Sequence, residues 1–223
     1  MIIYFIVFGV MLLSFIIQKV LTNRFEKYSK VGISLSGAEI VERMMQDNDI
    51  DDVKVMAING QLTDHYNPQE HSINLSQSVF NQRNIAAAAI AAHETGHCIQ
   101  HAQGYGPLKL RTALVPVVSF ANRTVSWVLL LGVLLIETMP ILLDIGIALF
   151  AITTFFSIVT LPVEINASRR AIAWLEQSGI ATYETLPMAK DALKWAAYTY
   201  VIAALGSLAT LFYYISLSNN RRY

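Results

Sequence analysis

Three residues in the stretch HETGH combine types and spacing that can do chemistry: His93, Glu94 and His97. On a helix the two histidines share one face, because residues four apart lie about 40° apart and one turn along the axis. Their imidazole nitrogens can therefore bind one metal ion at about 2.0–2.1 Å. Glu94 follows the first histidine directly, so its carboxylate can hold a water at that ion. This H-E-x-x-H pattern predicts a zinc site with Glu94 as the base.

The same stretch also contains His101 and the single cysteine of the chain, Cys98. A straight helix carries His101 one turn beyond an ion held by the first two histidines, so we expect it to be structural or to support a ligand. A related motif has its third histidine six positions after the second, where this chain has Gln103. We expect Cys98 to be a small buried residue.

A zinc peptidase needs a third protein ligand and an open position for water. The candidates are histidines and carboxylates in the polar segments, namely His65, His71, His101, Glu164, Glu176 and Glu184. We favour Glu164, because Pro162 is expected to begin a new helix with Glu164 in its first turn and Ser168 on the same face. The alternative is that Glu164 only stabilises the positive end of that helix.

The composition is that of a membrane protein. Of the 223 residues, 54% are hydrophobic and 14% charged, which is more apolar than a soluble domain usually is. The net charge is zero, so no global field attracts nucleic acid, and a lone cysteine excludes an internal disulfide. Long apolar stretches cover the first 21 residues, residues 125–162 and residues 196–217, and the middle stretch fits two helices joined by a turn. About four transmembrane helices are therefore predicted.

These stretches divide the chain into six parts: an anchor (1–21), a catalytic segment with a small β-sheet and the HExxH helix (22–113), a transmembrane hairpin (114–162), a segment with the third ligand (163–195), a last transmembrane helix (196–217) and a tail (218–223). Because the hairpin crosses the membrane twice, both polar segments must lie on one side, where they can build one site. Lysines and arginines gather in these segments, which places them in the cytoplasm.

Local patterns predict the elements of the catalytic segment. Ser36 and Glu39 have the spacing of a capping box and predict a short helix. Strand-like stretches at 53–55, 62–66 and 72–75, separated by Asn-Gly and Asn-Pro turns, predict a small antiparallel sheet. The HExxH helix is expected to run from Gln77 or Asn84 to Gln103 and to end at Gly104.

Three motifs, LTDHYNP, AAHETGHCIQHAQGY and LPVEINASRRA, occur in this order between apolar segments. Together they resemble the neutral zinc metallopeptidase family of bacteria (YugP-like) and, more distantly, HtpX-type membrane proteases and CAAX prenyl proteases. The resemblance implies a gluzincin site with His93, His97 and Glu164 as zinc ligands and Glu94 as the catalytic base. In the HtpX-type pattern an aspartate that orients a ligand histidine stands where this chain has Ser168. The resemblance leaves that role to either Ser168 or Asn166.

The resemblance also bears on neighbouring residues. LTDHYNP is similar to the edge strand on which such proteases lay an extended substrate. His65 and Tyr66 would then line the cleft, although a solvated hairpin explains them equally well. Arg169 or Arg170 would stabilise the oxyanion of the tetrahedral intermediate, or would anchor the segment at the cytoplasmic face.

The sequence thus predicts a mainly α-helical protein of the bacterial cell membrane, with about four transmembrane helices and a small cytoplasmic α+β catalytic part of the zincin type. Its predicted function is that of a zinc metalloendopeptidase acting on peptides or membrane proteins close to the bilayer lipid. The alternatives are an inert membrane metal-binding or scaffold protein and a prenyl-protein protease, for which four helices leave only a small lipid chamber. The sequence does not specify an oligomeric state or a cleavage preference.

Overall fold

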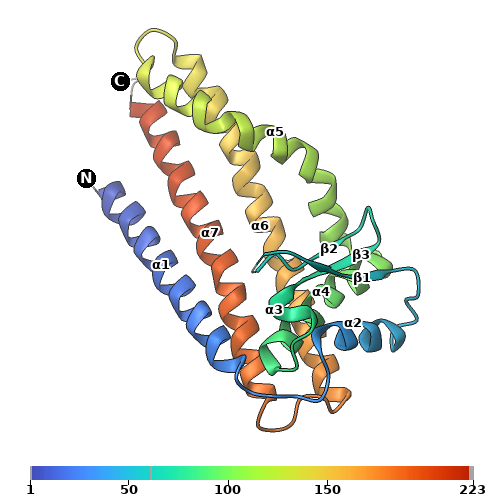
Figure 1. Ribbon diagram of the computed structural model, residues 1–223. Coiled ribbons are helices and arrows are strands. Elements are labelled where there is room, and N and C mark those ends of the chain that lie inside the picture. The colour runs from blue at the N-terminus through green and yellow to red at the C-terminus, as the bar shows by residue number, and fades with distance from the viewer. Residues whose placement is uncertain (1, 61, 221–223) are drawn as a thin grey trace. The chain divides into compact units, whose positions relative to one another are not determined.

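The computed structural model describes residues 2–60 and 62–220, and most of them are helical (Figure 1). The helices are α1 (Ile2–Tyr28), α2 (Gly37–Gln46), α3 (Gln77–Phe80), α4 (Ile85–Ala102), α5 (Gly106–Leu134), α6 (Pro140–Gln177) and α7 (Leu186–Asn220), and the strands are β1 (Lys54–Ile58), β2 (His65–Asn67) and β3 (Ser72–Ser76). The chain forms two compact units. We call them the helical unit (Met1–Ile16, Lys109–Leu161 and Thr199–Tyr223) and the mixed unit (Ile17–Leu108 and Pro162–Tyr198).

Within the described residues, four helices are long and apolar enough to cross a membrane: Phe5–Tyr28, Gly106–Leu134, Pro140–Gln177 and Leu186–Asn220. They expose large apolar side chains such as Phe8, Phe120 and Trp127, which suits a lipid environment. The predicted number of transmembrane-length helices and the small sheet are therefore confirmed.

One prediction about α6 is wrong. Pro162 lies inside a continuous helix of 38 residues and does not begin a new one. Proline removes a single backbone hydrogen bond, and long apolar helices tolerate that loss where neighbouring groups compensate for it. Glu164 is therefore far from a helix N-terminus, so stabilisation of a helix end does not explain its position.

The three-stranded sheet belongs to the mixed unit and has the order β1-β3-β2. Strand β2 pairs antiparallel with β3, as predicted, but β1 pairs parallel with β3 instead of forming a hairpin with β2. The parallel pairing arises because the chain after β1 crosses to the far side of β3. Asp64 holds this crossing in place by accepting hydrogen bonds from the backbone N–H of Ser76 at 2.7 Å and from its hydroxyl at 3.0 Å. β2 is consequently an edge strand.

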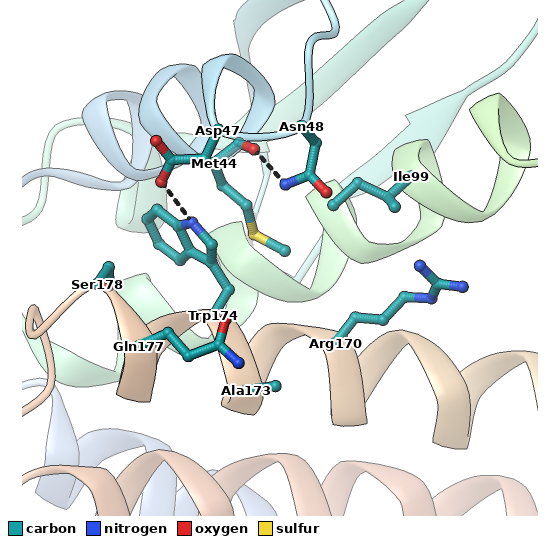
Figure 2. A pocket seen from close by; sticks show the side chains of 9 residues that line it. All are labelled: Met44, Asp47, Asn48, Ile99, Arg170, Ala173, Trp174, Gln177 and Ser178. Atoms are coloured by element: carbon teal, nitrogen blue, oxygen red, sulfur yellow. Dashed lines mark hydrogen bonds between the residues drawn. The ribbon is translucent and has the colours of Figure 1, made fainter.

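Helix α2 connects the sheet side of the mixed unit to α6. The predicted capping box is confirmed: the Ser36 side chain accepts from Glu39 N–H, and the Glu39 side chain accepts from Ser36 N–H. At the other end of α2, Trp174 of α6 donates its indole N–H to Asp47 at 2.8 Å (Figure 2). A cavity of about 370 Å³ lies beside this contact. The bond ties α6 to the end of α2, which itself packs against α4.

Helix α4 begins and ends close to the predicted positions. The Asn84 side chain caps its first turn by accepting from Ala87 N–H, and Gly104 follows its end with a φ of 64°. In the middle, α4 approaches α6 so closely that a Cβ atom on Gly96 would lie 2.7 Å from the carbonyl oxygen of Ala167. Ala167 is itself fully buried. Small residues on both helices therefore allow the backbones to touch beside the HExxH motif.

In the helical unit, α5 and α6 form a similarly close pair. A Cβ atom on Gly132 would lie 2.7 Å from the backbone of Leu143. At the start of α6, Asp144 accepts a hydrogen bond of 2.6 Å from Ser218 of α7. A polar contact thus joins two otherwise apolar helices within this unit.

The contact at Gly96 predicts the effect of one added methyl group. Alanine gains about 1 kcal/mol of helix propensity over glycine, but overpacking against a backbone costs about 1–3 kcal/mol. We expect Gly96→Ala to separate α4 from α6, to lower the unfolding temperature in detergent and to weaken zinc binding. Gly9→Ala is the control, because a Cβ atom on Gly9 of α1 meets nothing within 4 Å. If both variants bind zinc and unfold like the wild type, the close contact is not required.

Candidate metal centre

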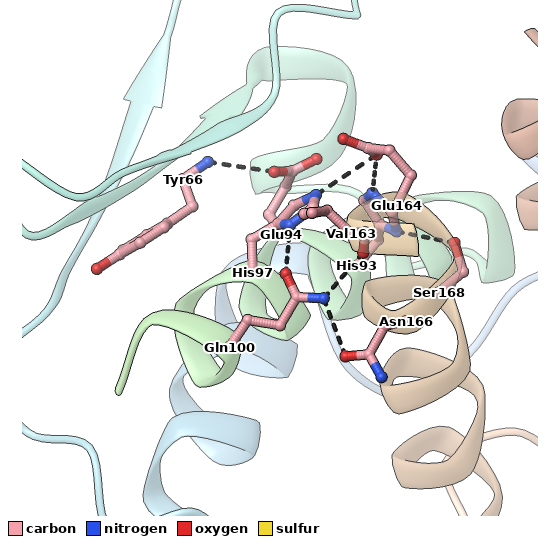
Figure 3. Close-up of polar contacts among 9 residues, drawn as sticks. All are labelled: Tyr66, His93, Glu94, His97, Gln100, Val163, Glu164, Asn166 and Ser168. Carbon is pink, nitrogen blue, oxygen red and sulfur yellow. Dashed lines mark hydrogen bonds and ion pairs between the residues drawn. The ribbon is translucent and has the colours of Figure 1, made fainter. Parts of the chain in front are cut away.

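Helices α4 and α6 bring two histidines and a carboxylate together inside the mixed unit (Figure 3). Oε2 of Glu164 lies 3.3 Å from Nε2 of His93 and 3.5 Å from Nε2 of His97. The candidate ligand atoms of the three residues all lie within 4.8 Å of one another. Two atoms that bind zinc at about 2.0–2.1 Å with tetrahedral angles are about 3.3–3.4 Å apart. The measured separations therefore fit a zinc ion bound by two Nε2 atoms and one carboxylate oxygen.

The centre is largely shielded from solvent. The Glu164 residue is 2% exposed and His97 is 8% exposed, while His93 is partly buried. Burial alone lowers the pKa of His97, but the hydrogen bond to Glu164 and the charges of Glu94 and Glu164 raise it above its ordinary value overall. A carboxylate buried against two imidazoles is the environment expected of a cation site, since buried charges need compensation.

Each histidine also has a partner on its other ring nitrogen. Nδ1 of His93 lies 3.1 Å from the Ser168 hydroxyl, and Nδ1 of His97 lies 3.1 Å from Oε1 of Gln100. When Nδ1–H donates to these oxygens, Nε2 of each ring keeps its lone pair for a metal. Ser168 therefore occupies the supporting position that the resemblance left open between Ser168 and Asn166.

Gln100 is the residue that sequence reasoning missed. It is fully buried, and its amide N–H groups donate to the backbone oxygen of Val163 at 2.8 Å and to the Asn166 side chain at 2.9 Å. It thus joins His97 on α4 to the residues that flank Glu164 on α6. The available signal was its place three residues after His97 and seven after His93, on the same helix face.

An arginine at the end of this network determines the direction of its hydrogen bonds. Nε of Arg170 donates to Asn166 at 2.7 Å, and a guanidinium can only donate. The Asn166 atom at this contact is therefore its oxygen, which also accepts from Gln100. Gln100 then presents its own oxygen to His97, whose Nδ1 must carry the hydrogen. Arg170 supports the metal-binding tautomer of His97 through two amides.

Glu94 lies at the partly open side of the centre, next to the edge strand. Its Oε2 accepts a hydrogen bond of 3.1 Å from the backbone N–H of Tyr66 in β2. This bond holds one carboxylate oxygen and leaves the second oxygen of the same group to act as an acceptor. Strand β2, which the sequence suggested as part of the cleft, is thus in direct contact with the HExxH helix.

The structure separates the remaining candidate residues from the centre. His101 is hydrogen-bonded to the Tyr66 hydroxyl at 2.8 Å, and burial raises the pKa of that hydroxyl to about 12, so it stays protonated. Cys98 is buried, as predicted, and burial raises its pKa to about 12. Three other third-ligand candidates have partners elsewhere: His65 contacts Thr63 and Asn74, His71 contacts Asp52, and Glu176 contacts Lys190. None of these contacts involves the metal centre.

Comparison with known proteins gives an independent assignment. A family model described as "Putative neutral zinc metallopeptidase" matches residues 3–219. The chain is 40% identical over 224 residues to "Putative membrane protease YugP" of Bacillus subtilis (strain 168), and the match covers 100% of this chain and 99% of that protein. No solved structure matches the chain. The family and the metal centre both indicate zinc as the cofactor.

The position of Gln100 predicts that it supports zinc binding without contacting the ion. Gln100→Leu removes the acceptor for His97 and both donors to α6, and we expect zinc affinity to fall by about 10- to 100-fold. The measurement is competition for zinc against a chelating dye. Gln77→Leu on α3 is the matched control, because the Gln77 side chain contacts Asn59, outside the centre. Equal zinc affinity in the two variants would contradict this role.

Proposed function

Because the chain belongs to the neutral zinc metallopeptidase family, we propose that it is a membrane-embedded zinc metalloendopeptidase of the gluzincin type. The observation that carries the proposal is the meeting of His93, His97 and Glu164, at tetrahedral spacing, beside the carboxylate of Glu94. The ligands would be Nε2 of each histidine and a carboxylate oxygen of Glu164. This combination, with an open position for water, is typical of catalytic zinc sites.

Glu94 would carry the proton during hydrolysis. When bound, zinc lowers the pKa of a coordinated water to about 7 and polarises the scissile carbonyl. Glu94 accepts the proton of the attacking water on the oxygen that Tyr66 does not hold, and then delivers it to the leaving amine. Substrate would lie along the edge strand β2 as an added strand.

We place the site in the cytoplasm, close to the bilayer of the cell membrane. Glu164 follows the apolar stretch of α6 within two residues of Pro162, so the ligand lies near the end of a span. Basic residues occur in both segments of the mixed unit and are absent from the 137–144 turn of the helical unit. This asymmetry supports cytoplasmic polar segments. Peptides and membrane proteins near the lipid surface are the substrate class this location favours, and the proposal includes no role for nucleic acid.

The mechanism predicts different outcomes for a base variant and a ligand variant. Glu94→Gln should keep zinc and lose about 100- to 10,000-fold in turnover of casein, because only proton transfer is removed. Purified Glu164→Ala should contain less than one zinc ion per protein molecule, because one of the three ligands is removed. Both are compared with the wild type, with and without a chelator, by metal analysis and by release of casein peptides. Full turnover in Glu94→Gln would exclude Glu94 as the base, whereas a wild type that binds zinc and releases no casein peptides would indicate an inert metal-binding protein.

The orientation predicts the side on which fused reporters lie. Alkaline phosphatase is active only outside the cytoplasm, so its fusion after Tyr223 should be active and its fusion after Gly179 inactive. A green fluorescent protein at the same two positions should give the opposite pattern. Phosphatase activity at Gly179 would show that the mixed unit faces the outside.

A further inference from the structure

A second cavity of the mixed unit lies outside the metal centre. It has a volume of about 350 Å³ and is lined by the end of α1, α3, the first half of α4, Leu62 and the start of α7. Apolar side chains form most of its wall, including Phe25, Leu62, Ile90, Leu193 and Ala196. It has the size and apolar lining of a ligand pocket.

Helix α4 connects this cavity to the metal centre. Ala86 and Ile90 line the cavity, and His93 and His97 follow them on the same helix face at steps of three or four residues. Ile90 is only three residues, or about 4.5 Å of helix rise, from His93. Ile90, His93 and Glu94 are also the partly exposed residues of a helix that is otherwise buried between Ile85 and Gln100. The open side of α4 therefore runs from the cavity to the metal ligands.

The wall of the cavity opposite α4 also continues toward the metal centre. The chain leaves the cavity at Leu62 and reaches Tyr66 four residues later, where the backbone N–H contacts Glu94. Asp64 fixes this short segment to the end of β3. Both walls of the cavity thus extend to the base and the ligands, so a peptide on strand β2 can place a side chain in the cavity while its backbone lies at the metal centre.

We propose that this cavity is a subsite for a large aromatic or aliphatic side chain next to the scissile bond. The proposal rests on the proposed peptidase function and specifies its substrate class. A cavity of about 150 Å³ holds one benzene molecule, so this one accepts the largest apolar side chains. Continuity of the cavity walls with the metal centre favours a peptide side chain over a lipid.

Filling the cavity from its far wall tests the proposal. Ala196→Phe on α7 places a ring in the cavity, away from every residue of the metal centre. Ala197→Phe is the matched control, because Ala197 is the neighbouring residue and is not part of the lining. The full-length proteins in detergent are given a proteolytic digest of casein, and new cleavage sites are identified by mass spectrometry. Zinc content and the unfolding temperature show whether each variant is folded.

We expect the wild type and Ala197→Phe to prefer Phe or Leu over Ala or Asp at one fixed position beside the cleaved bond by at least about tenfold. Ala196→Phe should reduce this preference by about tenfold with zinc content unchanged. Cleavage without any apolar preference, or a preference that survives in folded Ala196→Phe, overturns the subsite. Loss of a co-purifying phospholipid in Ala196→Phe, with the peptide preference intact, assigns the cavity to lipid and also overturns it.

A binding measurement separates the subsite from the peptidase function. Zinc-loaded Glu94→Gln is titrated with a fluorescent peptide that carries one central Phe and with the same peptide carrying Ala. Tighter binding of the Phe peptide, lost on adding Ala196→Phe, supports the subsite even if the wild type cleaves nothing. Equal binding of both peptides overturns the subsite even if casein is hydrolysed. If Ala196→Phe does not fold, Phe25→Ala, which enlarges the cavity, should shift the preference toward larger side chains, and an unchanged preference overturns the proposal.

Discussion

The close contact between α4 and α6 is the constraint on which the metal centre depends. HETGH supplies two of the proposed ligands and the proposed base from one helix, but Glu164 is 67 residues beyond His97 in the chain. It reaches the histidines because Gly96 and Ala167 let the two backbones meet and because Gln100, hydrogen-bonded to His97 on its own helix, donates two hydrogen bonds across the same contact. The small residue inside the motif is therefore as necessary to the geometry as the ligands beside it.

The groups around the ligands also affect the chemistry that the centre can do. Ser168 and Gln100 are both neutral, so neither histidine gains the basicity that a carboxylate partner would provide. The proposed ligand set then contributes one formal negative charge, on Glu164. A divalent ion held by these residues would polarise a carbonyl and acidify water more strongly than an ion held by more anionic ligands. Arg170, which the sequence suggested as an oxyanion donor, acts at the other end of the amide network, where it orients Asn166.

Local patterns were predictable from the sequence, whereas among distant contacts only the meeting of Glu164 with the histidines was expected, from the membrane topology and the family resemblance. The capping box at Ser36, the helix around His93 and the burial of Cys98 depend on neighbouring residues and match the structure. The parallel pairing of β1 with β3 depends on where the chain crosses, which an Asn-Gly turn does not determine. Pro162 was misjudged because an isolated proline breaks soluble helices more often than long apolar ones. Gln100 was missed because its spacing from His97 shows only that it can reach the imidazole, whereas its contacts with Val163 and Asn166 depend on how α6 packs against α4.

The apolar helices have a second use beyond crossing the membrane. The end of α1 and the start of α7 enter the mixed unit and form part of the wall of the apolar cavity, while α6 continues from its apolar stretch into the third ligand. Three of the four long apolar helices, α1, α6 and α7, would therefore contribute to the proposed metal site or to the proposed substrate cavity. The transfer of apolar surface from water has a favourable free energy. An apolar peptide segment near the lipid surface would therefore enter such a cavity more favourably than a polar one. The proposed membrane location and the proposed preference for apolar segments would thus both follow from the same helices.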